Sequence, residues 1–477
     1  MPLALTGSGL TLADLVAVAR TGERVELAPE ALERMRRARA VAAAAIDGDA
    51  PVYGLSTGVG VRKRARVLRT EQTEFNRRLI LNHLVGQGPA APEDVVRATM
   101  VTLANVFASG ATPAGPRLAE LVVTALNERR HPPVRILGSL GQADLAPMAD
   151  LAHGLLGPEA ELEPGEGLAL LNNNAFASGW AALALHDCGR LLDAALVAGA
   201  LDLEAFAANL SIVDPAVVRE RPYAGLGEAA AALRSLLAGT EVVARNLQDP
   251  LSFRCLPQVH GAALDEFRFA RGQVEIELYS ALGKPLVEAD GGRTLSVSNF
   301  DVLPVAAALD FLRIAVAPVL TSANERMVKL LQAPLSGLPE GLSERAGTAE
   351  DSLSEYGPAG QALTAEARLL AQPVSFELAS SAHAEGIEDR ATMAPLGARR
   401  TAELVALGEG IVAIELLVAA QAVDLRGHRL GVGTRRAYEL VRDRIPFKGE
   451  VDPIPATLEP LAELVRSGAL GEALART

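Results

Sequence analysis

Two long segments constrain the fold of this chain more than any other feature. Residues 180–210 carry few charges, and residues 396–425 are almost wholly apolar in their second half. A helix that is apolar nearly all round is buried, so we expect both segments inside a bundle of helices. The sequence leaves open whether this chain or neighbouring copies bury them.

The composition predicts a mainly α-helical class. Hydrophobic residues make up 49% of the 477 positions and aromatic residues only 4%. The apolar positions are mostly Ala, Leu and Val, which favour packed helices over strands, and no alternating strand pattern of useful length appears. Further helical segments are expected at 29–47, 74–110, 114–130, 225–248, 262–282, 302–333 and 359–371, with a short helix capped by Thr11 and two short helices after 434.

We expect residues 1–477 to form a single helical chain with three regions. An N-terminal region of about 1–178 would carry the site, 179–440 would form the central helix bundle, and 441–477 would form C-terminal helices.

Charge, cysteine and hydropathy patterns exclude several classes of protein. The net charge is −13 without a basic stripe, which argues against nucleic acid as a partner. Cys188 and Cys255 make no disulfide framework and no CxxC motif, as expected of a cytoplasmic protein. No signal peptide and no uncharged run of 18 apolar residues is present, so we expect no membrane span. No metal-binding pattern is found, and we expect neither metal nor cofactor.

Three stretches hold candidate site residues. The segment Pro51–Gly60 has three glycines within seven residues, which predicts a mobile loop over 53–64, not a packed element. Tyr53 there is either a half-buried loop aromatic or a phenol held over a site on a lid. His83 lies in a helical segment, where a structural role and a ligand-binding role are nearly equally expected.

Residues 138–149 read GSLGQADLAPMA, and Asp144 and Pro147 in this stretch favour a helix start whose positive end attracts an anion. Three asparagines follow at 172–174. They either cap the chain locally or direct amides at a ligand.

In order along the chain, these stretches resemble the histidine/phenylalanine/tyrosine ammonia-lyase family. The family shows a Gly-Ser-(apolar)-Gly segment, an Ala-Ser-Gly triad and Asp-Leu-Ala-Pro-Leu, and its Tyr-Gly loop carries a tyrosine that acts as catalytic base, the role implied for Tyr53. The resemblance also implies an elongated helical bundle and a homotetramer whose active sites draw residues from several subunits. It implies these substrate-binding residues: His83, Asn172, Gln248, the carboxylate-binding Arg254, Phe300 and Glu388.

The departures from the family pattern gather at positions expected to line the pocket. In the family, the Ala-Ser-Gly triad cyclises into the electrophilic methylidene-imidazolone (MIO) group, but here only Gln142-Ala143 lies between Gly141 and Asp144. Leu251 stands in place of a second catalytic tyrosine, and Leu282-Gly283-Lys284 replaces Thr-Asp-Asn. Tyr279, Asp301 and Arg390 also replace family residues. The sequence therefore predicts a family member without MIO.

Losing the electrophile argues against ordinary deamination, because the loss should cost a large part of the barrier reduction, which in enzymes is about 8–23 kcal/mol. The first hypothesis is an MIO-independent enzyme that performs elimination of a better leaving group, isomerisation or cyclisation on a small carboxylate or carbonyl metabolite in a specialised pathway. Tyr53 would act as general acid or base, with its pKa lowered by Arg254. Arg254 would clamp a carboxylate, and Asn172, Gln248 and Gln142 would offer amides.

The second hypothesis is a catalytically inactive paralogue that binds a ligand or regulates an active partner. The loss of both the triad and the tyrosine at 251 favours it. Retention of Tyr53, Asn172, Gln248 and Arg254 favours the enzyme, since a binding relic has no need of the phenol.

Overall fold

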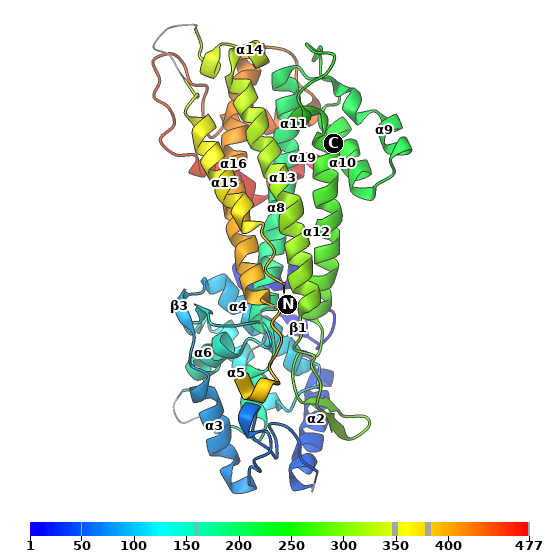
Figure 1. Cartoon of the computed structure of the whole chain (residues 1–477), viewed down its shortest axis with the longest axis vertical. Coiled ribbons are helices and arrows are strands. Elements are labelled where there is room, and N and C mark those ends of the chain that lie inside the picture. The colour runs from blue at the N-terminus through cyan, green and yellow to red at the C-terminus, as the bar shows by residue number, and fades with distance from the viewer. Residues whose placement is uncertain (49, 158–160, 346–351, 377–382, 476–477) are drawn as a thin grey trace. The chain divides into compact units, whose positions relative to one another are not determined.

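The computed structural model describes residues 1–48, 50–157, 161–345, 352–376 and 383–475 (Figure 1). The chain is mainly α-helical, as predicted, and divides into two compact units. Unit 1 comprises Met1–His186, Ala270–Asp310 and Pro373–Arg399, and unit 2 comprises Asp187–Phe269, Phe311–Gln372 and Arg400–Thr477. Four long helices contribute residues to both units: α8 (Ala175–Phe206), α12 (Leu256–Leu278), α13 (Leu303–Leu331) and α16 (Ala394–Arg426).

The two apolar segments form α8 and α16, which confirms the prediction of two long buried helices. Every residue from Ile411 to Val423 of α16 is buried. This burial is supplied by the chain itself, which answers the question that the sequence left open.

Unit 1 combines short helices with three two-stranded sheets. Its helices are α1 (Leu12–Val16), a π-helix (Ala17–Thr21), α2 (Pro29–Asp47), α3 (Gln72–Asn82), α4 (Glu93–Ala108), α5 (Pro116–Asn127), α6 (Leu145–Leu156) and α7 (Glu166–Leu171). Strand β1 (Leu3–Leu5) pairs in parallel with β2 (Val25–Leu27), while β3 (Gln87–Ala90) with β4 (Arg135–Leu137) and β5 (Leu286–Glu288) with β6 (Arg293–Leu295) are antiparallel. Thr11 caps α1 with a capping box, as predicted.

The prediction of one continuous helix over residues 74–110 is wrong. Helix α3 ends at Asn82, strand β3 follows, and α4 begins at Glu93. Gly86, Gly88 and Pro89 explain the break, because Gly88 adopts a φ of +77° and proline cannot continue a helix. A three- or four-residue strand is too short to show an alternating pattern, so the sequence reading missed it.

The remaining α-helices of the described residues lie in unit 2. They are α9 (Pro215–Glu220), α10 (Ala224–Leu236), α11 (Leu251–Arg254), α14 (Ala333–Ser336), α15 (Tyr356–Leu370), α17 (Val432–Arg442), α18 (Glu459–Ser467) and α19 (Gly471–Ala475). The helix expected over 225–248 is shorter than predicted, because it ends at Leu236 and Gly239 then takes a φ of +80°.

Helix α13 is long and apolar enough to cross a membrane by length and composition, alone among the helices of the described residues. However, 61% of its most apolar window is buried inside the protein. A core helix passes the same test, so this helix is weak evidence for a membrane span.

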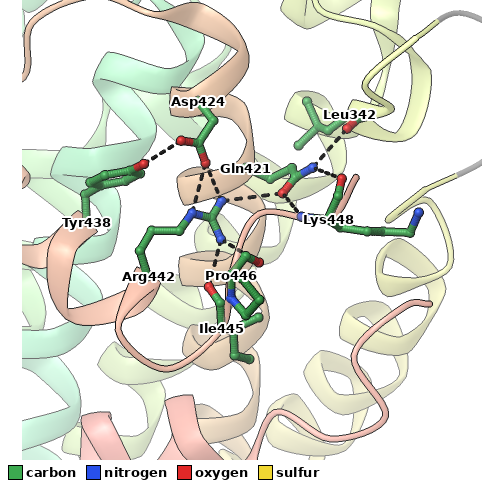
Figure 2. Close-up of polar contacts among 8 residues, drawn as sticks. All are labelled: Leu342, Gln421, Asp424, Tyr438, Arg442, Ile445, Pro446 and Lys448. Carbon is green, nitrogen blue, oxygen red and sulfur yellow. Dashed lines mark hydrogen bonds and ion pairs between the residues drawn. The ribbon is translucent and has the colours of Figure 1, made fainter. Parts of the chain in front are cut away.

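A polar network in unit 2 fastens the chain after α17 to α16 (Figure 2). The Arg442 guanidinium donates to Asp424 at 2.6 and 2.9 Å and to the carbonyl of Ile445 at 3.1 Å. Gln421 donates to the Lys448 carbonyl at 3.0 Å and accepts from the Lys448 amide at 3.1 Å. Tyr438 completes the network by donating to Asp424.

We expect Arg442→Met to lower the free energy of unfolding by about 2 kcal/mol, because hydrogen bonds to charged groups contribute about 1.5–3 kcal/mol each. Urea unfolding followed by circular dichroism measures the change. The matched control is Arg444→Met: Arg444 is exposed, and its guanidinium donates to the Leu440 carbonyl at 2.9 Å. That variant should change stability by less than about 0.5 kcal/mol. Equal losses in the two variants would contradict the role given to the network.

Candidate active site

Unit 1 holds a cavity of about 440 Å³ whose lining gathers most of the predicted site residues. Six of them line it: Tyr53, His83, Gln142, Asn172, Phe300 and Glu388. They come from widely separated parts of the chain, so only the fold brings them together. Gln248 and Arg254 belong to unit 2 and are not among the lining residues, nor is Leu251.

Tyr53 stands at the start of a packed turn, which corrects the prediction of an unpacked loop. Residues 54–58 are buried, and the amides of residues 55–57 donate to the Val52 carbonyl at 3.0–3.2 Å. Gly54 adopts a φ of +71°, and a Cβ there would lie 2.1 Å from Leu168 Cδ2. The glycines predict mobility, but the structure shows that close packing requires the glycine at position 54. Tyr53 is therefore well positioned at the cavity.

The environment of Tyr53 keeps its phenol protonated at neutral pH. The phenol oxygen accepts a hydrogen bond from the Gly60 amide at 3.0 Å. Burial raises the pKa of Tyr53 above its ordinary value of 10, the Gly60 bond opposes this shift, and the Glu388 carboxylate adds to it. The predicted lowering of this pKa by Arg254 is not seen, because Arg254 does not line this cavity. A protonated phenol at the cavity can donate a hydrogen bond or a proton.

The three asparagines divide between the two roles considered for them. Asn173 donates to the carbonyls of Ala169 and Leu170, both at 3.1 Å, and Asn174 donates to the Gly141 carbonyl at 3.3 Å. These two serve the local structure. Asn172 lines the cavity, and its buried Oδ1 has no hydrogen-bond partner in the described chain. An unpaired buried acceptor is costly, so Asn172 is suited to a ligand that donates.

His83 follows α3 directly and is half-buried in the cavity wall. Its Nδ1 lies 2.7 Å from the Leu79 carbonyl oxygen, which can only accept, so Nδ1 carries the proton. In the neutral ring Nε2 is then an acceptor, which suits a ligand with an N–H or O–H group.

The loop at residues 138–143, which we call the floor loop, is tied down on several sides. The Leu140 carbonyl accepts from the Met393 amide at 2.9 Å, and the Gly141 carbonyl accepts from the Thr392 hydroxyl at 2.8 Å. Gln142 forms an antiparallel bridge with Asp301 and donates to its carboxylate at 3.3 Å. A loop held by this many contacts is a defined part of the cavity.

Asp144 anchors the end of the floor loop. Its carboxylate is fully buried and accepts from the Ala177 amide at 2.8 Å and from the Ser139 hydroxyl at 3.1 Å. Desolvation raises the pKa of Asp144 to about 7, against the two hydrogen bonds. Helix α6 begins at Leu145, as predicted, but the Asp144 side chain bonds the start of α8 instead of capping α6.

The residues of the floor loop do not fit a self-formed MIO group. The triad that would cyclise is missing, and Ser139 is followed by Leu140. The Ser139 hydroxyl is already engaged, since it donates to Asp144 and accepts from the Gly141 amide at 3.2 Å.

The backbone conformation of the floor loop predicts different effects on stability for substitutions at two of its positions, Gly141 and Ala143. Gly141 has a φ of +78°, and a Cβ there would lie 2.3 Å from Thr392 Oγ1 and 2.9 Å from the Ala394 nitrogen. Gly141→Ala should cost about 2–4 kcal/mol from strain and overpacking. Ala143 has a φ of +58°, so Ala143→Gly relieves strain and should stay within about 1 kcal/mol of wild type. Urea denaturation of both variants is the check, and a Gly141→Ala variant as stable as wild type would mean that the floor is not fixed.

Sequence reasoning missed two charged residues in the cavity lining, Lys284 and Arg390. Both were noted only as departures from the family pattern. A charged residue replacing Asn or His within pocket segments was the available signal. Among the described residues, no group of three His, Cys, Asp or Glu is placed to hold a metal ion.

Comparison with known proteins gives a consistent family. The profile of the family described as "Aromatic amino acid lyase" matches residues 10–161 and 158–443. The histidine ammonia-lyase of Treponema denticola is 34% identical over 473 residues, covering 93% of this chain and 92% of that protein. The histidine ammonia-lyase of Gloeobacter violaceus is 36% identical over 504 residues, covering 99% and 97%.

Two solved structures are also similar. The ergothioneine-degrading ergothionase of Treponema denticola superposes with a TM-score of 0.92 at 27% identity and covers 98% of this chain and 99% of its own. The tyrosine aminomutase of Streptomyces globisporus superposes with a TM-score of 0.91 at 27% identity, covering 100% and 99%. With the profile match spanning nearly the whole chain and relatives more than 30% identical over most of its length, this chain belongs to the aromatic amino acid lyase family.

Proposed function

We propose that this chain is an enzyme of the aromatic amino acid lyase family that works without MIO. It performs acid–base chemistry, namely elimination of a good leaving group, isomerisation or cyclisation, on a small carboxylate or carbonyl metabolite of a specialised pathway. The observation that carries the proposal is the floor loop. The loop lacks the triad, yet it is fixed by Thr392, Met393 and Asp301 beneath a cavity that retains Tyr53 and Asn172.

The cavity supplies a donor and an acceptor of protons. The Tyr53 phenol is the donor, since its pKa is raised. Glu388 is the one carboxylate among the described lining residues and is the candidate base. Removal of a proton by Glu388 at one atom and delivery by Tyr53 to another accounts for isomerisation, cyclisation, or departure of a hydroxyl-type group. Asn172, His83 and Gln142 would position the substrate between them.

The relatives support a family enzyme without fixing its substrate. The curated relatives are named histidine ammonia-lyases, and solved neighbours include aminomutases and an ergothionase. The ergothionase degrades ergothioneine, which is not one of the common amino acids. The same fold therefore supports more than one reaction, as expected when function depends on the site.

The proposal includes a cytoplasmic homotetramer with shared active sites. Phe269, Phe311 and Ile314 of unit 2 are 46–51% exposed, an apolar surface suited to a second copy. Gln248 is exposed and Arg254 half-buried in unit 2, so in an assembly they would reach the cavity of another copy.

The function is tested through the natural substrate. Deletion of the gene should cause one metabolite to accumulate, and the purified protein should convert it, whereas histidine and ergothioneine serve as comparison substrates. If the protein leaves the accumulated compound unchanged and binds it, the inactive ligand-binding paralogue is correct instead. If it deaminates histidine at a rate typical of enzymes in general, about 1 to 10³ per second, the proposed MIO-independent chemistry is wrong.

The shared site is tested by mixing subunits. The Tyr53→Phe and Arg254→Met variants should each have low activity alone. When equal amounts are unfolded together and reassembled, up to about a quarter of the cavities combine a native Tyr53 from one copy with a native Arg254 from another. The mixture should therefore recover up to about a quarter of the wild-type activity. No recovery in a mixture of correct size would contradict sharing between copies.

A further inference from the structure

Lys284 stands on a loop that is packed against the cavity wall. The preceding Gly283 has a φ of +144°, and a Cβ on it would lie 2.9 Å from the Asn172 carbonyl oxygen. Leu282 is 2% exposed, and the Asn299 amide donates to the Ala281 carbonyl at 3.2 Å. The backbone that carries Lys284 is therefore held beside Asn172.

The Lys284 ammonium contacts aromatic rings. Its Nζ lies 4.1 Å from the centre of the Tyr53 ring and 6.0 Å from that of Phe300. The side chain is half-buried, and within the described part of the chain no carboxylate forms an ion pair with it. Ring faces attract a cation by about 0.5–1 kcal/mol at exposed sites and about 2 when desolvated, but they do not neutralise its charge.

The other cation of the lining is already paired. Arg390 Nε lies 3.8 Å from the Asp301 carboxylate. Burial lowers the pKa of Lys284 more than the Glu388 carboxylate raises it, which means that the charged amine is short of stabilising partners. An anion entering the cavity gains most by lying next to Lys284.

We propose that Lys284 is a catalytic residue of this chain, whose ammonium contacts the carboxylate of the substrate and stabilises the negative charge that develops there. The inference rests on the proposed function. When Glu388 takes a proton from the carbon next to the carboxylate, the C–H electron pair moves into the carboxylate, and the oxygens gain charge. Those electrons return when the neighbouring bond breaks or when Tyr53 delivers a proton to another carbon. The Lys284 charge supplies part of the stabilisation that the missing electrophile provided in other family members.

The test separates binding from turnover. Calorimetry measures the binding of 3-phenylpropionate and imidazole-4-propionate, each against its neutral carboxamide, to the full-length protein. Wild type should bind at least one carboxylate about 10-fold or more tightly than its amide, since a favourable charge contact contributes a factor of this order. In an Arg254→Met background, which removes the second proposed carboxylate contact, Lys284→Met should reduce the preference to within about 2-fold, and Lys284→Arg should keep most of it.

The matched control is Arg37→Met. Arg37 of α2 pairs with Asp290 at 2.9 Å on the exposed surface of unit 1 and does not line the cavity. This variant should bind both probes as wild type does. Thermal unfolding of all variants shows whether each is folded, and Lys284→Gln, which also removes the charge, replaces Lys284→Met if that variant does not fold.

Three outcomes would overturn the proposal: no carboxylate preference in wild type, a preference that survives Lys284→Met in the Arg254→Met background, or a Lys284→Met variant that converts the accumulated metabolite at the wild-type kcat/KM. The last result leaves the proposed function standing. If the carboxylate preference depends on Lys284 but the protein shows no turnover, the anion site at Lys284 is supported and the proposed enzyme function is contradicted.

Discussion

Tyr53→Phe should lower kcat on the natural substrate by about 10² to 10⁴-fold, the range that a positioned proton-transfer group contributes. The substitution removes only the hydroxyl, which accepts from the Gly60 amide at 3.0 Å. The packed turn beneath the ring, including Gly54 and Leu55, is unchanged. KM should therefore change little, and steady-state kinetics separates the two constants.

A pH profile gives an independent check of this role. Because burial raises the pKa of Tyr53 above its ordinary value of 10, the phenol is protonated throughout the neutral range and a proton-donor role is lost only as pH rises through the raised value. Tyr223→Phe is the control, since Tyr223 is 61% exposed in unit 2. A Tyr53→Phe variant as active as wild type, or an activity that requires the ionised phenolate, would contradict the assignment.

The second large effect concerns stability, and it comes from a buried charge cluster in unit 2. Arg326 donates from Nε to Asp202 at 2.8 Å and to Glu415 at 3.0 Å, and from Nη1 to the Ser252 carbonyl at 3.2 Å. All three charged side chains are at most 1% exposed. Arg326→Met leaves two buried carboxylates without their cation, and we expect a loss of about 3–5 kcal/mol at pH 7.

The loss should shrink as the pH is lowered. Burial and the neighbouring Glu415 carboxylate already raise the pKa of Asp202 well above its ordinary value. A carboxyl group with a raised folded-state pKa contributes stability below its unfolded pKa and loses it as pH rises through the folded value. Without Arg326 the pKa of Asp202 is raised further. The free energy of unfolding of the Arg326→Met variant should therefore approach that of wild type as the pH falls from 7 to 4.

Urea unfolding at several pH values measures this dependence. Arg219→Met is the control, because Arg219 and Glu220 form a surface pair 69% and 73% exposed. It should change stability by less than about 0.5 kcal/mol at every pH. A loss in Arg326→Met below about 1 kcal/mol, or one independent of pH, would contradict the account of the cluster.

The sequence predicts the long buried helices from hydrophobic periodicity, and it predicts most of the site residues from the order of motifs along the chain. The apolar runs within α8 and α16 marked the core because no other environment suits them. Six of the eight site residues lie around one cavity. Gln248 and Arg254 could not be placed in this way, because a single chain puts them in unit 2.

Other features depend on contacts that a sequence does not display. Gly54 looks like a flexible residue until Leu168 is seen against it. In the sequence, Lys284 stands out only as a departure from the family pattern, and the structure shows its ammonium over the Tyr53 ring. The short strand β3 has too few residues for a periodic signal. In each case the deciding partner is distant in the chain.

The central claim, catalysis without MIO, is tested most directly by borohydride treatment. The purified protein is incubated with borohydride, which reduces the electrophile of a conventional family member, and its turnover of the accumulated metabolite is compared with that of an untreated sample, along with the near-ultraviolet spectrum. We predict no MIO absorbance and unchanged turnover. Loss of turnover on treatment, together with loss of an absorbance band present beforehand, would contradict the account.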